Sequence, residues 1–405
     1  MNDTPRRSPS PPLRSSGDQR RGDPKNSATT DRTPDPASSP DAATSAESRE
    51  SVRRRRAARP RGAKQLDSTA LIYLVLLGVV VVSAVLTAME GRNFFSQGNI
   101  WAVLTAMSVL GLIAVGQTLV ILVGSLDLSV PYVVSLSTVI AAGGMKGLDS
   151  NLSAALVNTL VVCAVVGFVM GVLVSVFDVH GFIASLGVGL IVSGYLATNY
   201  QGSHGDASPA LELLGRSGIA AVIPTSFIIL LVAALLVTLM LRYTRLGHHV
   251  YAIGGNRDVA RLSGVRTALP VIAVHVLCSL LAGLAGLLLL SRTGVGLPTI
   301  GSQGRYDLLS IAAVVLGGTL LSGGKGSVVG TLGGVAIFAV LDNVMGVMQV
   351  NPFLKDFVRG LVIVLAVAVY ARRSVVRRPP RFAGTRPSLP TPGSITGSTT
   401  KEETA

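Results

Sequence analysis

The chain has 405 residues, of which 49% are hydrophobic and 14% are charged, and its mean hydropathy is +0.56. This composition excludes an ordinary soluble domain, in which about a quarter of the residues are charged. The formal net charge of +14 is concentrated toward the two ends of the chain, which is typical of segments that flank membrane spans. We therefore expect a membrane protein that binds membrane lipids and no nucleic acid.

The two ends of the chain differ in composition from the rest. Residues 1–66 are rich in proline, serine, aspartate and arginine, and residues 373–405 have a similar composition. Such segments bury too little apolar surface to offset the entropy of ordering, so we expect two disordered tails. The transmembrane domain is expected to occupy residues 67–372.

Between the tails lies a succession of apolar runs. A helix needs about 20 residues to cross the hydrocarbon core, and on this basis we predict ten spans and an all-α polytopic membrane protein. The third and eighth spans are short. The expected ranges are 69–89, 101–123, 128–145, 153–177, 181–200, 219–242, 268–290, 306–321, 327–349 and 354–371.

The charge distribution predicts an orientation. With ten spans, both tails lie on one side of the membrane, together with the connection 243–267. That connection carries Arg245, Arg257, Arg261 and Arg266. Because short cytoplasmic loops hold the excess of lysine and arginine, we expect both termini in the cytoplasm.

Several kinds of chemistry are absent from the sequence. Cys163 and Cys278 lie inside apolar runs, where a thiol packs as a small hydrophobe. No zinc-type spacing, nucleophile elbow or pair of catalytic carboxylates is present. The segment around Lys325 fails as a P-loop, because Thr319 stands in place of the first glycine and Gly326 replaces the hydroxyl residue. We expect a chain that is no enzyme and needs neither cofactor nor metal.

A carboxylate follows the second span. Asp127 and Ser129 have two interpretations. They are an ordinary cap of the next helix, with Pro131 in its first turn, or they are part of a transport path, because a carboxylate at membrane depth normally faces protein or water. Both interpretations stay open.

Two glycine-containing segments form a weak internal repeat. Gly124-Ser125-Leu126 resembles Gly318-Thr319-Leu320, which closes the eighth span. Paired glycine-interrupted segments mark broken helices near a substrate path in transporters, although matches this short often arise by chance. The candidates for a translocation path or broken helix are Gly124, Asp127, Ser129, Gly318, Thr319, Gly323 and Gly324.

The connection between the sixth and seventh spans contains signals for a short helix. Gly254 and Gly255 form a breaker with Asn256, which suits an N-cap, and a helix from Asp258 to Leu262 would end at Gly264. A short helix held at the membrane surface by two spans can dock into a partner's groove. An ordinary basic loop would explain the arginines but not this arrangement.

Other polar residues lie within the spans. His275 could relay protons, but a hydrogen bond to a neighbouring helix is the plainer interpretation. Asp342, with Asn343 beside it, stands out because charges in lipid are disfavoured. Asp356 and Arg359, three residues apart on one helix face, are expected to neutralise each other.

The sequence resembles the carbohydrate-uptake ABC permeases of the ribose and xylose type. The motifs that carry the resemblance follow one another in order and cover nearly everything between the tails. They are GQTLVI at 116–121, DLSV at 127–130, FIASL at 182–186, YAIGGN at 251–256, ARLSG at 260–264, IAAVVLGGT at 311–319 and SGGKG at 322–326.

This resemblance implies a subunit of a bacterial inner-membrane importer that forms the path for a monosaccharide such as ribose or xylose. The implied partners are a second permease copy, two cytoplasmic ABC ATPase domains and a periplasmic or lipid-anchored sugar-binding protein. It also implies that the short helix couples the permease to the ATPase. The coupling residues would be Gly254, Gly255, Asn256, Asp258, Ala260, Arg261, Leu262, Ser263 and Gly264.

Departures from the family pattern leave the identity of the transported sugar open. Pro131 stands where these permeases usually carry glycine, and Asp307 and Leu309 replace a usual glutamate and aspartate. An ion- or proton-coupled secondary transporter is the alternative, and it would need a relay of ionisable groups within the membrane.

Overall fold

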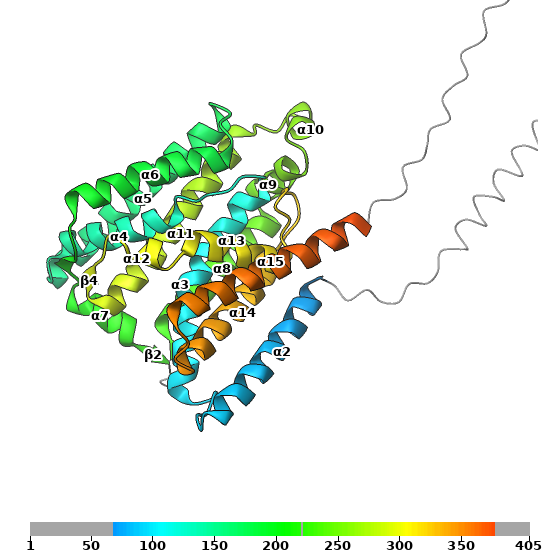
Figure 1. Cartoon of the computed structure of the whole chain (residues 1–405). Helices are drawn as coiled ribbons and strands as arrows, with labels where there is room; N and C mark the ends of the chain where they lie inside the picture. Colours follow the sequence, from blue (N-terminus) through cyan, green and yellow to red (C-terminus); the bar gives the residue numbers. More distant parts are fainter. Residues whose placement is uncertain (1–67, 220–221, 377–405) are drawn as a thin grey trace, which may run out of the picture. The chain divides into compact units, whose positions relative to one another are not determined.

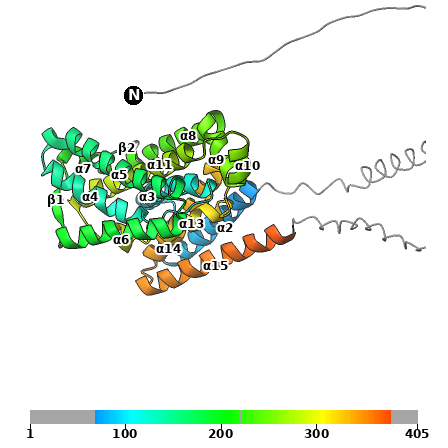
Figure 2. The ribbon, with the colours of Figure 1, turned by 90° about the horizontal axis from the view of Figure 1, so that it is seen from above.

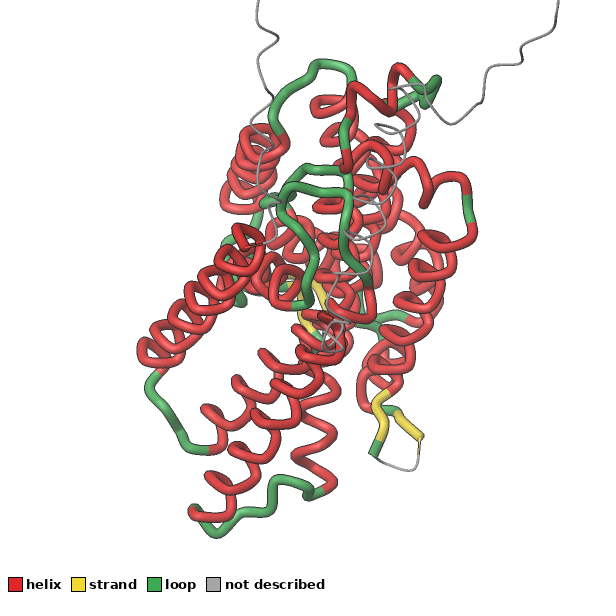
Figure 3. Tube along the Cα trace, turned by 90° about the vertical axis from the view of Figure 1, so that its right-hand side faces the viewer, coloured by secondary structure: helices red, strands yellow, loops and turns green. Residues whose placement is uncertain are grey.

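Helices make up nearly all of the regular structure in the computed structural model, which describes residues 68–219 and 222–376. The strands are confined to two short antiparallel pairs (Figure 3): β1 (His204–Asp206) with β4 (Val295–Gly296), and β2 (Gly218–Ile219) with β3 (Ile223–Pro224). Both predicted tails lie outside the described residues, except that the last helix continues to Val376, beyond the expected end of the transmembrane domain at residue 372.

The helices follow one another along the chain with short connections. They are α2 (Ser68–Met89), α3 (Gln97–Leu122), α4 (Val130–Met145), α5 (Leu152–Ser175), α6 (Gly181–Asn199), α7 (Pro209–Arg216), α8 (Thr225–Tyr243), α9 (Arg245–Gly255), α10 (Arg257–Leu262), α11 (Ala268–Thr293), α12 (Ile300–Gln303), α13 (Tyr306–Leu316), α14 (Val328–Val347) and α15 (Pro352–Val376), with a 3-10 turn at Asp149–Asn151.

Among the described residues, seven helices are long and apolar enough to cross a membrane. They correspond to the first, second, fourth to seventh and ninth predicted spans. The third and eighth predicted spans are the shorter apolar helices α4 and α13. The tenth predicted span lies within α15, which is not one of the seven membrane-length helices. A helix satisfies its own backbone hydrogen bonds, which the hydrocarbon core requires. The prediction of an all-α polytopic membrane protein is confirmed.

Two predicted spans have wrong limits for identifiable reasons. The eighth was expected to reach residue 321, but α13 ends at Leu316. Gly318 follows with a φ of +84°, a left-handed conformation that ends the helix. The sixth was expected from residue 219, but α8 begins at Thr225 because the β2–β3 hairpin precedes it.

α3 is the central helix of the described structure. Its membrane-length window is 83% buried, whereas that of α2 is 11% buried. The helices α8, α11, α13 and α14 all pack against α3, and small residues allow the close approach: a Cβ on Gly116 would lie 3.0 Å from the Cα of Cys278 on α11. The apolar side chains that α2 leaves exposed suit contact with lipid.

The short helices divide between two ends of the bundle (Figures 1 and 2). α9 and α10 lie at one end, and α7 lies at the other with the β2–β3 hairpin. α3 has 26 residues and therefore extends over about 39 Å between these ends. Its last turn lies beside α9, and its first turn lies at the α7 end.

Candidate functional site

Three connecting segments meet at the end of the bundle that carries α9. The first is Gly124 after α3, the second is Gly254 in the last turn of α9, and the third is Gly323 and Gly324 between α13 and α14. We call these four residues the glycine junction. It joins residues that were assigned separately from the sequence, to the coupling element and to the translocation path.

The backbones touch directly at the glycine junction. The Gly324 N–H donates to the Leu122 carbonyl oxygen over 3.0 Å. A Cβ on Gly254 would lie 1.8 Å from that same oxygen and 2.5 Å from the nitrogen of Gly324. A Cβ on Gly323 would lie 2.9 Å from the nitrogen of Gly124. At Gly254, Gly323 and Gly324, a side chain would therefore collide with the backbone of a neighbouring segment.

Glycine is also required at the junction by backbone conformation. Gly124, Gly323 and Gly324 have φ angles of +81°, +83° and +72°, which side-chain-bearing residues rarely adopt. These turns direct the Gly324 N–H toward Leu122, whose carbonyl belongs to the last turn of α3 and lacks an intrahelical partner.

The weak repeat has a structural counterpart at the ends of α3 and α13. Gly124 donates to Ile121 over 2.9 Å and Ser125 donates to Val120 over 3.0 Å. Gly318 donates to Val315 over 2.9 Å and Thr319 donates to Val314 over 3.2 Å. Since Gly318 also has a positive φ of +84°, both helices end in the same hydrogen-bonded turn.

A side-chain hydrogen bond adds to the junction. The Tyr251 hydroxyl on α9 donates to the Gly326 carbonyl oxygen over 3.0 Å. Burial raises the pKa of Tyr251, so the phenol stays protonated and able to donate. Gly326 packs against Thr319, which is fully buried. Tyr251 thus ties α9 to the connection between α13 and α14.

α10 has the cap and the stop that the sequence predicts. Asn256 Oδ1 accepts from the Val259 N–H over 3.0 Å, and Gly264 ends the segment with a φ of +84°. The predicted helix break at Gly254, Gly255 and Asn256 is shorter in the structure. Gly254 and Gly255 belong to α9, so only Asn256 separates α9 from α10. α9 itself was not predicted.

One face of α10 is anchored and the other is free in the described chain. Ala260 is buried, whereas Val259 is 58% and Leu262 is 88% exposed. Asp258, Arg261 and Ser263 are also exposed. Arg257 forms an ion pair with Asp178 at 2.7 Å and donates to the Ser175 carbonyl oxygen over 3.2 Å, which fixes α10 against the connection between α5 and α6.

A buried polar turn follows the junction. Asp127 is fully buried, and its Oδ1 accepts from the Ser129 N–H over 2.9 Å and from the Ser129 hydroxyl over 2.5 Å. The Gln117 amide, oriented to satisfy both groups, pairs with the backbone N–H and carbonyl of Asp127 at 3.2 Å each. Asp127 thus closes the turn that precedes α4, whereas the Ser129 side chain makes no capping hydrogen bond to α4. The other carboxylate oxygen of Asp127 has no hydrogen-bond partner in the described part of the chain.

His275 has a structural role. Its Nδ1 lies 2.8 Å from the Val271 carbonyl oxygen and its Nε2 lies 3.3 Å from the Ser125 hydroxyl. With a proton on Nδ1, the ring donates to Val271 and accepts from Ser125. It therefore connects α11 to the turn that holds Asp127, and its partner there is a turn residue rather than a residue of a neighbouring helix.

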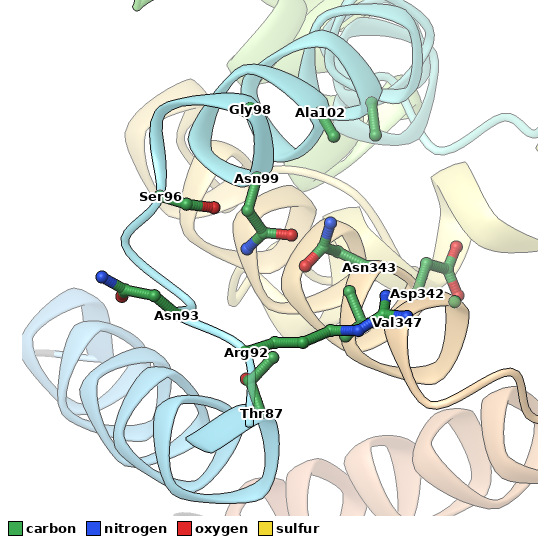
Figure 4. A pocket seen from close by; sticks show the side chains of 12 residues that line it. Thr87, Arg92, Asn93, Ser96, Gly98, Asn99, Ala102, Asp342, Asn343 and Val347 are labelled. Atoms are coloured by element: carbon green, nitrogen blue, oxygen red, sulfur yellow. The ribbon is translucent and has the colours of Figure 1, made fainter. Parts of the chain in front are cut away.

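A polar cleft of about 750 Å³ lies at the other end of α3. Asn99 and Asn343 point toward one another in it, and Arg92 reaches toward α14 (Figure 4). Sequence reasoning singled out Asp342 and Asn343 but not the residues from α2 and α3. The cleft is lined by Thr87, Arg92, Asn93, Ser96, Gly98, Asn99, Ala102, Ala106, Asp342, Asn343, Gly346 and Val347.

A charge network supports one wall of the cleft. Arg359 on α15 pairs with Asp342 at 2.8 Å and with Asp356 at 3.2 Å. Arg305 pairs with Asp356 at 3.0 Å. The expected neutralisation of Asp356 by Arg359 is therefore only part of a network that joins α14, α15 and the start of α13.

Replacing Arg359 with methionine is expected to destabilise the protein by about 1–3 kcal/mol, because two partly buried carboxylates would lose a shared partner. A lower melting temperature of the purified protein would show this. The matched control is Arg216→Met, which breaks a pair with Glu212 whose arginine is 75% exposed and should cost less than about 1 kcal/mol. Equal melting temperatures for the two variants would contradict the prediction.

In the described ranges 68–219 and 222–376, no three histidine, cysteine, aspartate or glutamate side chains gather as metal ligands. Cys163 and Cys278 are both free and buried.

Comparison with known proteins defines the class. Residues 99–367 match the family described as "Branched-chain amino acid transport system / permease component", and the chain belongs to this family. No solved structure matches the chain.

Individual relatives cover most of the chain. The ribose import permease protein RbsC of Escherichia coli (strain K12) is 38% identical over 298 residues, which are 73% of this chain and 92% of that protein. RbsC of Bacillus subtilis (strain 168) is 35% identical over 75% of this chain and 92% of its own length. The D-allose transport system permease protein AlsC of Escherichia coli (strain K12) is 30% identical over 72% of this chain and 89% of that protein. The resemblance to sugar-uptake ABC permeases of the ribose type is confirmed.

Proposed function

We propose that this chain is the permease subunit of an ABC importer and forms the path by which a monosaccharide crosses the bacterial inner membrane. The observation that carries the proposal is the 38% identity to a ribose import permease over 92% of its length. The related allose permease makes an aldose the substrate class, with ribose the first sugar to test. ATP is hydrolysed on a separate subunit.

The proposed partners follow from the same class. Two copies of the chain assemble with two ATPase domains and receive the sugar from an extracytoplasmic binding protein. α10 faces the cytoplasm with both termini, in agreement with the arginines of the connection 243–267. The polar cleft then lies at the extracytoplasmic end.

The exposed face of α10 is the docking surface for the ATPase in this proposal. Val259 and Leu262 supply apolar contacts, and the Arg257–Asp178 pair keeps the helix in place. The residues from Asn256 to Gly264, together with Gly254 at the end of α9, therefore act as the coupling element. Transport follows from movement of helices around the path, without covalent chemistry on this chain.

A Leu262→Glu variant is expected to weaken ATPase binding by about tenfold, because burying an unpaired charge in place of an apolar anchor costs more than 1 kcal/mol. Its 88% exposure predicts little change in the stability of the permease alone. Titration of the ATPase onto permease in nanodiscs measures the effect. Gln201→Glu, at an exposed position in the connection between α6 and β1, is the control, and equal binding by both variants would count against this surface.

Uptake of radiolabelled sugars tests the proposed function. Vesicles containing the permease, its ATPase and its binding protein should accumulate D-ribose, D-allose or D-galactose when ATP is supplied. The second candidate substrate is a branched-chain amino acid, because the family description carries that name. Accumulation of leucine without any of the sugars would overturn the proposal.

A further inference from the structure

We propose that Gly254 is a positioning residue that transmits movement of α10 to two connections at once, the one between α3 and α4 and the one between α13 and α14. The inference rests on the proposed function and names the contact through which that function would work. A movement of α9 would then displace the ends of α3 and α13, which have the same hydrogen-bonded turn, at the same time.

The first step is the connection between α10 and Gly254. α9 runs from Arg245 to Gly255 and α10 starts at Arg257, with only Asn256 between them. Asn256 caps α10 through its side chain, and α9 and α10 pack against each other. Because one residue joins the two helices, a docked ATPase that displaces α10 also displaces α9.

The second step is the contact of α9 with the two connections. Gly254 packs directly against the Leu122 carbonyl oxygen and the Gly324 nitrogen. A Cβ on Gly254 would lie only 1.8 Å from the first atom and 2.5 Å from the second. The Gly324 N–H is bound to that same oxygen. Backbone groups in such contact cannot swing aside as side chains do, so α9 cannot shift without moving both neighbours.

The third step leads from the junction into the bundle. Gly124 is separated from Asp127 by only two residues, one of them Ser125. Ser125 lies beside His275 on α11 and packs against Gly181 at the start of α6, where a Cβ would lie 1.9 Å from its hydroxyl oxygen. A shift of the junction therefore reaches α6 and α11 as well as the turn that starts α4.

The neighbouring glycine provides a matched control. A Cβ on Gly255 would meet no atom within 4 Å, whereas a Cβ on Gly254 would meet Leu122 at 1.8 Å. Both residues belong to the last turn of α9, so alanine affects their helix propensity alike. They differ only in the contact on which the inference depends.

The experiment compares Gly254→Ala with Gly255→Ala in vesicles that contain the complete importer. ATP hydrolysis and D-ribose uptake are measured on the same preparation. Because coupling between two sites is typically worth 5–150-fold, Gly254→Ala should lower the sugar transported per ATP hydrolysed by about tenfold. Gly255→Ala should leave this ratio unchanged. An unchanged ratio in Gly254→Ala, or an equal fall in both variants, would overturn the inference.

A second variant tests the inference in case the Gly254→Ala protein fails to assemble. Tyr251→Phe removes only the hydrogen bond to the Gly326 carbonyl and should lower the same ratio by about fivefold, the low end of typical coupling. A normal ratio in Tyr251→Phe would then contradict the inference. Wild-type importer is assayed first, since absence of ATP-driven uptake in the wild type refutes the proposed function rather than the role of Gly254.

Discussion

An Asp127→Leu variant is expected to lose most sugar uptake, by about tenfold or more. Leucine would leave the Ser129 N–H and hydroxyl without their acceptor at a fully buried position, and each unpaired buried group costs about 1–3 kcal/mol. The turn that starts α4 would then rearrange beside the glycine junction. Radiolabelled uptake, normalised to the amount of assembled importer, measures the loss.

Asp127→Asn separates the two interpretations of this residue. Asparagine keeps the oxygen that accepts from Ser129 and serves as a cap about as well as aspartate. We therefore expect uptake within about threefold of wild type, since threefold corresponds to less than 1 kcal/mol. If Asp127→Asn loses uptake as completely as Asp127→Leu, the charge itself is required, and Asp127 acts directly in the transport path.

A Gly334→Ala variant is expected to be much less stable than wild type. Gly334 on α14 faces α13, and a Cβ there would lie 2.1 Å from the Ala313 carbonyl oxygen. The two helices would have to separate, and such overpacking costs about 1–3 kcal/mol or more. The melting temperature of the purified protein and its yield in the membrane fraction should both fall.

Gly194→Ala is the control for this helix contact. Gly194 lies within α6, and a Cβ there would meet no atom within 4 Å. Alanine favours a helix over glycine by about 1 kcal/mol, so this variant should match or exceed the stability of wild type. A Gly334→Ala protein as stable as Gly194→Ala would contradict the packing of α13 on α14.

The features that the sequence predicts are local ones. Apolar runs of membrane length correspond to helices because the length and composition needed for a span are contained in the run itself. The cap at Asn256 and the stop at Gly264 follow from residue types within one short segment. The end of α13 was placed too late because the residue that ends it, Gly318 with a φ of +84°, is one of several glycines in that segment.

The glycine junction could not be predicted for a similar reason. Gly124, Gly254 and Gly324 come from three connections far apart in the chain, and glycines are frequent throughout this sequence. Only the tertiary structure distinguishes Gly254, which has no room for a Cβ, from Gly255, which has ample room. Likewise, Gln117 belongs to a motif in the sequence, but its pairing with the backbone of Asp127 appears only once α3 and the following turn are in place.

The energy source of transport tests the central claim most directly. Sealed vesicles containing the permease, the ATPase and the sugar-loaded binding protein are supplied either with ATP on the ATPase side or with a proton gradient. We predict D-ribose uptake that requires ATP and the ATPase and is unaffected by collapse of the gradient. Uptake by this chain alone, driven by the gradient without any ATPase, would contradict the account and indicate a secondary transporter.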